Sequence, residues 1–156
     1  MARTQAARCH PLTDPDLIKL YSTRILALAA DIPHLGQLDG AQAVVRERSP
    51  QCGSAVTVSL DVEDGRVARF AQDVKACALG QASAAVVGQA VMGRTKAEID
   101  QARDELRAML DGGSSPAAPF EDMEVLRAAV PFKNRHASIM LALEATSKAM
   151  GQAQSL

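Results

Sequence analysis

The chain has 156 residues, of which 47% are apolar and 3% aromatic, and its formal net charge at pH 7 is −1. This length suits one compact domain, whose core must be mostly aliphatic because the sequence has no Trp. The near-neutral charge offers no electrostatic basis for binding nucleic acid or an anionic membrane surface. No apolar run is long enough to span a bilayer, and we expect no secretory signal because no apolar stretch follows the charged N-terminus.

The first periodic segment along the chain is helical. Residues 1–13 show no periodicity and are predicted to be a tail. Thr13 or Asp14 is suited to cap a helix, and Pro15 fits its first turn. Apolar residues then recur at helical spacing to about residue 30, and Pro33 follows as a helix breaker.

A three-stranded antiparallel sheet is predicted in the middle of the chain. Val44 and Val45 indicate a short strand, and apolar residues at alternate positions over 56–62 indicate a strand with one buried face. The pair Asp64-Gly65 is typical of a tight turn. The chain is therefore expected to return as a partner strand over residues 67–74.

Helices are predicted for the rest of the domain. They are expected over residues 78–92, 95–111, 123–129 and 135–150. Thr95 and Glu98 form a capping-box pattern, and Asn134 is placed to cap the last helix. We therefore expect an α+β fold, in which a small antiparallel three-stranded sheet carries the N-terminal helix and the C-terminal helices on one side. The single domain is expected to cover residues 14–150, with a short tail over residues 151–156.

Three cysteines are candidates for chemistry: Cys9, Cys52 and Cys77. An odd number argues against a disulfide framework and favours a reducing compartment such as the cytoplasm. Cys52 directly precedes the best strand, and Cys77 joins the partner strand to a helix whose N-terminus, with Lys75, favours a thiolate. From spacing alone two interpretations stay open: a shared site at one sheet edge, or two small buried side chains.

Three ordered motifs resemble those of NifU/IscU-type iron–sulfur cluster assembly scaffolds. The segment Pro50–Ser54 is similar to the Pro-x-Cys-Gly-Asp loop of that family, and Cys77–Ala84 is similar to its second cysteine motif. The segment Phe132–Ala142 resembles its C-terminal motif, in which an Arg lies three residues before a third cysteine. The resemblance spans about residues 17–149 and is strongest to the SufU branch.

The resemblance implies a scaffold or carrier protein rather than an enzyme. Such a protein holds a labile [2Fe–2S] cluster or iron, or in some members zinc, through thiolates that suit these metals. It takes sulfur from a cysteine desulfurase and passes clusters to iron–sulfur acceptor proteins. The resemblance therefore implies that Cys52 and Cys77 are metal ligands and possible sulfur acceptors.

The sequence departs from the family at two ligand positions. Ser54 stands where the Asp is expected, and Ser138 stands where the third cysteine is expected. Serine is a poor metal ligand because its hydroxyl loses a proton far less readily than a thiol does. His136 lies near the third position and is predicted to act as a third ligand, or else to be an ordinary residue in a first helical turn.

The incomplete ligand set leaves three hypotheses. In the first, a homodimer contributes two cysteines from each chain to one cluster, or an outside ligand completes the set. In the second, the protein is a degenerate member that only accepts sulfur or binds a desulfurase. In the third, Cys52, Cys77 and His136 hold zinc. The pair Cys9-His10 and the loop residue His34 are weaker candidates for a role at the site.

Overall fold

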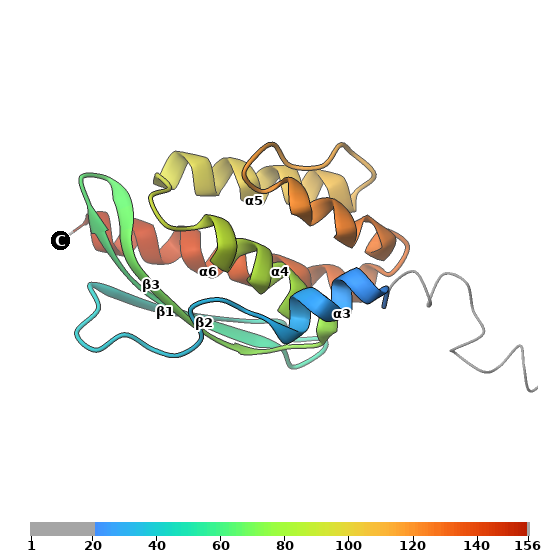
Figure 1. The fold of residues 1–156 in the computed structure, drawn as a ribbon, viewed down its shortest axis with the longest axis horizontal. Coiled ribbons are helices and arrows are strands. Elements are labelled where there is room, and N and C mark those ends of the chain that lie inside the picture. The colour runs from blue at the N-terminus through green and yellow to red at the C-terminus, as the bar shows by residue number, and fades with distance from the viewer. Residues whose placement is uncertain (1–20, 156) are drawn as a thin grey trace, which may run out of the picture.

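The computed structural model describes residues 21–155 of the chain, and Figure 1 shows how this part is arranged. The helices and strands of this part are α3 (Thr23–Ala30), β1 (Ala43–Arg48), β2 (Ala55–Glu63), β3 (Arg66–Lys75), α4 (Ala78–Ala90), α5 (Lys96–Leu110), the 3₁₀ helices η2 (Glu121–Ala129) and η3 (Lys133–Arg135), and α6 (His136–Gln154). The predicted α+β class is confirmed. The predicted tail over residues 1–13 and the predicted caps Thr13, Asp14 and Pro15 lie outside the described residues.

The sheet has the strand order β1-β2-β3, and both pairs of strands are antiparallel. Asp64 and Gly65 form the predicted turn between β2 and β3, with φ angles of 53° and 75°. Positive φ at both positions matches the right-handed twist of the flanking strands. Strand β1 is longer than predicted and extends to Arg48, because an edge strand accepts charged residues on its open face.

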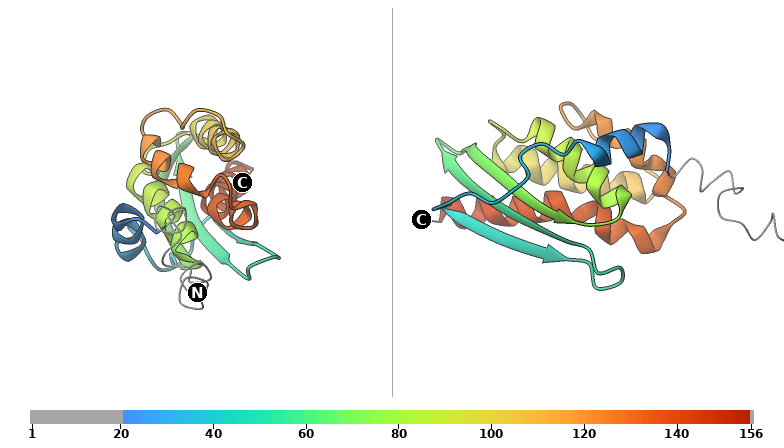
Figure 2. Two further views of the ribbon diagram at one scale, coloured as in Figure 1. Left: turned by 90° about the vertical axis from the view of Figure 1, so that its right-hand side faces the viewer. Right: turned by 60° about the horizontal axis from the view of Figure 1, so that its bottom comes forward.

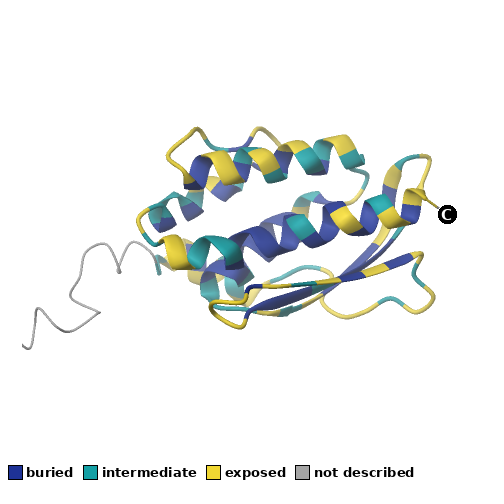
Figure 3. Ribbon diagram, turned by 180° about the vertical axis from the view of Figure 1, so that it is seen from behind, coloured by how far each residue is buried: buried dark blue, intermediate teal, exposed yellow. Residues whose placement is uncertain are grey.

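All helices of the described chain lie on one side of the sheet. In Figure 1 the sheet forms the lower layer and α4, α5 and α6 lie above it, while Figure 2 (right) brings the open side of the sheet forward. Val56, Val58 and Leu60 alternate along β2 toward the helices, and each is 0% exposed. Figure 3 shows the buried residues concentrated between this face and α6. The alternation read from the sequence is therefore the core face of the sheet.

Helix α6 is the central helix of the core and packs against β1, β2, α4 and α5. It continues to Gln154, so the tail predicted from residue 151 is wrong for this stretch. Ala153 is 7% exposed, and its packing extends the helix past Gly151. The predicted cap is also wrong: α6 follows directly from the 3₁₀ turn η3, and the position before its first residue is Arg135, not Asn134, with no side-chain cap bond.

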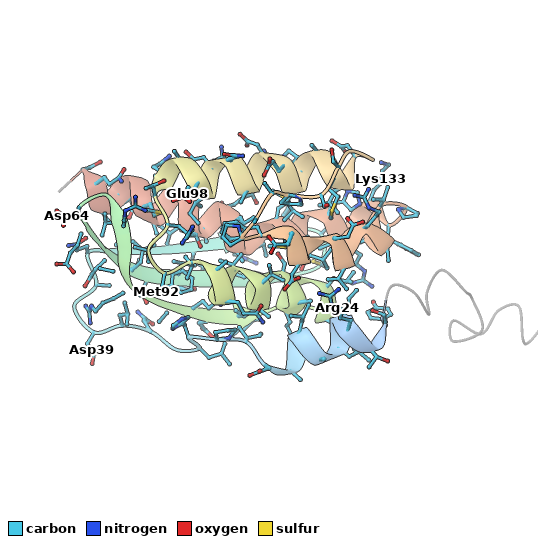
Figure 4. All side chains as sticks on the ribbon, turned by 45° about the horizontal axis from the view of Figure 1, so that its top comes forward. Arg24, Asp39, Asp64, Met92, Glu98 and Lys133 are labelled. Atoms are coloured by element: carbon cyan, nitrogen blue, oxygen red, sulfur yellow. The ribbon has the colours of Figure 1, made fainter. Side chains whose placement is uncertain are left out.

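Exposed ion pairs join elements on the helical side. Arg24 on α3 lies 3.0 Å from Asp122 on η2, and Figure 4 shows Arg24 at the end of the molecule away from the turn residue Asp64. The segment around Asp122 was predicted as a short helix and is a 3₁₀ helix. None of the described helices combines the length and apolarity that crossing a bilayer requires.

The capping box at the start of α5 is confirmed. Thr95 Oγ1 accepts a hydrogen bond from the Glu98 N–H at 3.2 Å, and Glu98 Oε1 accepts one from the Thr95 N–H at 3.0 Å. We expect Thr95→Ala to lower the free energy of unfolding by about 1 kcal/mol, because the Glu98 N–H loses its acceptor. Urea denaturation measures this change. Ser114→Ala, in the exposed loop after α5, is the control, and an equal loss there would contradict the role of the cap.

Candidate metal and sulfur site

The strand register brings the two described cysteines to one end of the sheet. Ala55 at the start of β2 pairs with Lys75 at the end of β3. Cys52 precedes this pair by three residues and Cys77 follows it by two, so both lie at the same end of the sheet. This end of the sheet is opposite to the β2–β3 turn, whose Asp64 is labelled in Figure 4.

Three serines connect these cysteines in a continuous series of contacts. Cys52 Sγ lies 3.2 Å from both Ser49 Oγ and Ser54 Oγ. Ser138 Oγ donates a hydrogen bond to Ser54 Oγ at 3.0 Å and lies 3.6 Å from Cys77 Sγ. We call these five residues the serine–cysteine cluster. It joins the β1–β2 loop, the start of α4 and the start of α6.

The β1–β2 loop places Cys52 at an exposed position. The Ser49 N–H donates to the Ser54 carbonyl at 2.8 Å, and the Gly53 N–H donates to the Ser49 carbonyl at 3.1 Å. Gly53 has a φ of 72°, a left-handed conformation that glycine adopts without strain. The turn therefore closes on itself and leaves the Cys52 thiol open to solvent while Ser49 and Ser54 are buried.

Hydrogen-bond contacts with buried serines lower the pKa of the Cys52 thiol. Ser49 first, and then Ser54, lower the pKa of this thiol from 9.0 to about 7, against the opposing effect of partial burial. Because the folded pKa is the lower one, the stabilisation from this group is complete above pH 9.0 and is lost as the pH falls through about 7. A nucleophilic thiolate is therefore present at neutral pH.

We expect Cys52 to react with iodoacetamide at half its maximal rate near pH 7, as its pKa of about 7 implies. Peptide mass spectrometry of the alkylated protein measures this rate across the pH range. Ser49→Ala should move the midpoint toward higher pH because it removes the contact that lowers this pKa most. Ser155→Ala, whose hydroxyl contacts Gly151, is the control. An unchanged midpoint in Ser49→Ala would contradict the assignment.

Cys77 occupies the N-cap position of α4, at the end of β3. Its φ and ψ are −66° and 170°, and its side chain makes no capping hydrogen bond. The side chain is half-buried. It thus faces Ser138 from the N-terminus of a helix of 13 residues.

Helices α4 and α6 approach closely at Gly80, one turn after Cys77. A Cβ atom on Gly80 would lie 2.6 Å from Ser138 Oγ and 2.8 Å from Ala76 Cβ. Both distances are shorter than side-chain contacts allow. The glycine is therefore what admits the Ser138 hydroxyl beside α4.

Gly80→Ala is expected to lower the free energy of unfolding by about 1–3 kcal/mol, because the added methyl group displaces Ser138 or separates the helices. Chemical denaturation measures the loss, and the pH profile of Cys52 alkylation reports the disturbed site. Gly151→Ala is a matched control on α6, since its Cβ would meet an ordinary contact of 3.4 Å with Lys96. If both variants had the same free energy of unfolding, the close approach of α4 and α6 at Gly80 would not contribute to stability.

His136 is not brought to the serine–cysteine cluster. Its Nε2 lies 2.9 Å from the Ala129 carbonyl oxygen, and it lines a pocket with Arg107 and Glu144. Two residues along an α-helix are about 200° apart in direction, so His136 and Ser138 face opposite sides of α6. Within residues 21–155 no group of three or more His, Cys, Asp or Glu side chains could hold a metal ion. The expected third ligand is therefore missing from this geometry.

His34, the other histidine of the described residues, is not part of the serine–cysteine cluster. His34 packs edge-to-face against Phe70, with 6.0 Å between the ring centroids, and its carbonyl accepts from the Gln72 N–H. Cys9 and His10 lie outside the described residues. Ser49 contacts Cys52 but was not among the predicted site residues. Its position three residues before Cys52, at the close of a tight loop, was the available signal.

Comparison with known proteins agrees with this architecture. The model of the NifU-like N-terminal domain family matches residues 20–152. The chain is 28% identical over 118 residues to the iron–sulfur cluster assembly scaffold protein IscU of Streptococcus pyogenes serotype M1, covering 75% of this chain and 74% of that protein. It is also similar to the crystal structure of a nitrogen-fixing NifU-like protein (N-terminal) from Brucella abortus. That likeness has a TM-score of 0.87 and 40% identity, and covers 90% of this chain and 98% of that one.

The fold is further shared with a SufU scaffold of the SUF system from Fervidobacterium islandicum. The TM-score is 0.75 at 19% identity, over 85% of this chain and 98% of that one. The protein belongs to the NifU-like N-terminal domain family, which includes iron–sulfur cluster assembly scaffolds. The family resemblance read from the motifs is thereby confirmed.

Proposed function

We propose that this protein is a scaffold or carrier, not an enzyme, that binds a labile [2Fe–2S] cluster or iron through Cys52 and Cys77. The observation that carries the proposal is the meeting of both thiols at one sheet end, joined through Ser54 and Ser138. The exposed thiol of Cys52 gives a cluster a route in and out. The scaffold name of the Streptococcus relative supports the same function.

The ligand set of one chain is incomplete for such a cargo. A [2Fe–2S] cluster is generally held by four protein ligands, and the described part of one chain supplies two thiols at this site. The hydroxyls of Ser54 and Ser138 are weak substitutes, because they are bonded to each other and deprotonate with difficulty. We infer that two copies of the chain share the cluster, each giving Cys52 and Cys77. An outside thiol is the alternative.

The sulfur for this cargo comes, in the proposal, from a cysteine desulfurase. Cys52 is the first acceptor because its thiol is exposed and its pKa is lowered to about 7. Cys77 is the second thiol of the site. Iron–sulfur acceptor proteins would then take the finished cluster. Thiols used in this way need a reducing compartment, so we place the protein in the cytoplasm.

A second candidate function is sulfur acceptance without a cluster of the protein's own. It is favoured by the serine pair, which occupies the space between the cysteines with a closed hydrogen bond of 3.0 Å. One accessible thiolate is enough to accept a persulfide. A zinc site is a weaker candidate, because His136 is turned toward Ala129 and leaves two thiols as ligands.

Anaerobic reconstitution with ferrous iron and sulfide tests these functions. We expect visible absorption typical of a [2Fe–2S] cluster, and we expect it in the dimer fraction on size-exclusion chromatography. Persulfide without a cluster spectrum, after incubation with a desulfurase and cysteine, would favour the second candidate. Absence of both cluster and persulfide would overturn the proposed function. Metal analysis of protein purified without added metal separately tests for zinc.

A further inference from the structure

The two borders of the sheet are covered differently. At the β3 border, the Gly36 N–H donates to the Gln72 carbonyl at 2.9 Å, and the Gln72 N–H donates to the His34 carbonyl at 2.8 Å. At the other border, β2 is the only strand that pairs with β1 within residues 21–155. Figure 2 (right) shows β1 along this border. The outer backbone groups of β1 are therefore available, in the described part of the chain, to pair with an added strand.

The side chains of β1 give this border a distinct chemistry. Val44, Arg46 and Arg48 alternate along the open face of the sheet and are exposed, Val44 to 47%. On the opposite face, Glu47 is paired with Lys148 of α6 at 2.6 Å. The described residues provide no ion-pair partner for either arginine. The border therefore presents two uncompensated cations and one apolar side chain in a row.

The open face beside β1 adds to this positive charge. A hollow of about 250 Å³ lies there, lined by Arg46, Ala55, Thr57, Asp73 and Lys75. Lys75, like Arg46, is exposed and has no ion-pair partner within residues 21–155. Asp73 is the one acid among the lining residues. Cations thus outnumber acids on this face, although the formal net charge of the whole chain is −1.

We propose that β1 is a docking strand for an acidic, extended segment of a partner protein, which adds to the sheet beside it. In such a complex the main-chain hydrogen bonds provide affinity, and the alternate side chains provide specificity. Opposite charges that face each other across two strands stabilise the pair. The expected segment therefore carries acidic residues at two alternate positions, opposite Arg46 and Arg48, and an apolar residue at the next alternate position, opposite Val44.

Charge argues against a second copy of this chain as the occupant. If β1 paired with β1 of another copy, each copy would bring Arg46 and Arg48 to the same face of one short ribbon. Like charges close to each other across two strands are destabilising. Charged residues on an edge strand in this way prevent self-association. An acidic segment turns the same two arginines into attractive contacts.

The position of β1 places the bound segment near the cysteine end of the sheet. The strand ends at Arg48, and the loop that carries the exposed Cys52 follows directly. None of the residues of β1 belongs to the serine–cysteine cluster. The inference therefore goes beyond the proposed function and does not require that a cluster be bound.

NMR titration of the full chain with a synthetic peptide tests the docking strand. The peptide is as long as β1, and glutamate occupies two alternate positions with valine at the next alternate one. We expect the amide signals of β1 to shift and their hydrogen exchange to slow. Added salt should weaken binding, because exposed charges attract the peptide. Unchanged β1 amides up to millimolar peptide, or equal binding of a peptide with lysine in place of glutamate, would overturn the proposal.

Alternate N-methylation of the peptide distinguishes strand addition from attraction between charges alone. Successive N–H groups of a strand point to opposite sides, so only one of the two methylation patterns blocks the hydrogen bonds to β1. We expect one methylated peptide to keep its affinity and the other to lose it. Equal affinities of the two methylated peptides would overturn strand addition.

A charge exchange tests the two arginines. Arg46→Glu/Arg48→Glu should weaken binding of the glutamate peptide about tenfold, because two attractive cross-strand pairs become repulsive. The same variant should gain affinity for the lysine peptide, which also shows that it is folded. Failure of this exchange would remove the arginines from the docking surface. Cys52→Ala/Cys77→Ala should bind the glutamate peptide like the wild type, so a failed cluster reconstitution and a failed docking strand are told apart. Loss of peptide binding in that cysteine variant would place the docking site elsewhere.

Discussion

The double variant Cys52→Ala/Cys77→Ala is expected to lose iron–sulfide loading completely within the sensitivity of visible absorption. These are the thiols that the sheet register brings to one edge, and the hydroxyls that remain are poor ligands for iron. Removing groups that merely support a metal ligand costs about 10–100-fold in affinity, so removing two ligands should cost more. Iron and sulfide analysis after anaerobic reconstitution measures the loss.

Matched variants separate this effect from general thiol chemistry. Cys9→Ala removes the third cysteine, which the sequence places outside the motif loops, and should bind as much iron and sulfide as the wild type. The single variants Cys52→Ala and Cys77→Ala should each lose most of the cluster, because a shared site would lose one ligand from each copy. A double variant that still forms the cluster would show that the ligands lie elsewhere.

Leu143→Ala is expected to produce a large loss of stability. Leu143 is 0% exposed on α6, the helix that packs against β1, β2, α4 and α5. The cavity should lower the free energy of unfolding by about 3 kcal/mol. For a chain of this length that corresponds to a fall in Tm of about 10 °C. Thermal and urea denaturation followed by circular dichroism measure both quantities.

Leu26→Ala is the control for this prediction because it makes the same chemical change on a surface. Leu26 lies on α3 and is 49% exposed, so the change in the free energy of unfolding should stay within about 0.5 kcal/mol. Similar losses in the two variants would mean that α6 does not organise the core. A Leu143→Ala protein as stable as the wild type would contradict the packing directly.

Ser54 and Ser138 do more than remove two metal ligands from the site. Ser54 and Ser138 are buried and bonded to each other, so their hydroxyls fill the space between the cysteines. A carboxylate and a thiol at these two positions would be able to bind a metal ion. Contacts of Cys52 with the hydroxyls of Ser49 first, and then Ser54, lower the pKa of its thiol.

Local signals in the sequence predicted most of the fold. The alternation over residues 56–62, the Asp64-Gly65 turn and the capping box at Thr95 each depend on neighbours in the chain, and each is confirmed. The predictions failed at the start of α6, where a 3₁₀ turn leads directly into the helix. They also failed at its end, where burial of Ala153 extends it to Gln154. These boundaries depend on packing against other elements, which a local pattern does not contain.

By itself the sequence determined the family and the fold class and singled out Cys52 and Cys77 as candidates, because motif spacing and periodicity are properties of a short stretch of chain. The tertiary structure alone decided which side chains meet there. It placed Ser49 and Ser54 against Cys52, brought Ser138 beside Cys77, and turned His136 away. The physical reason is that these contacts depend on a loop closure, on helical phase and on the close approach that Gly80 permits between α4 and α6.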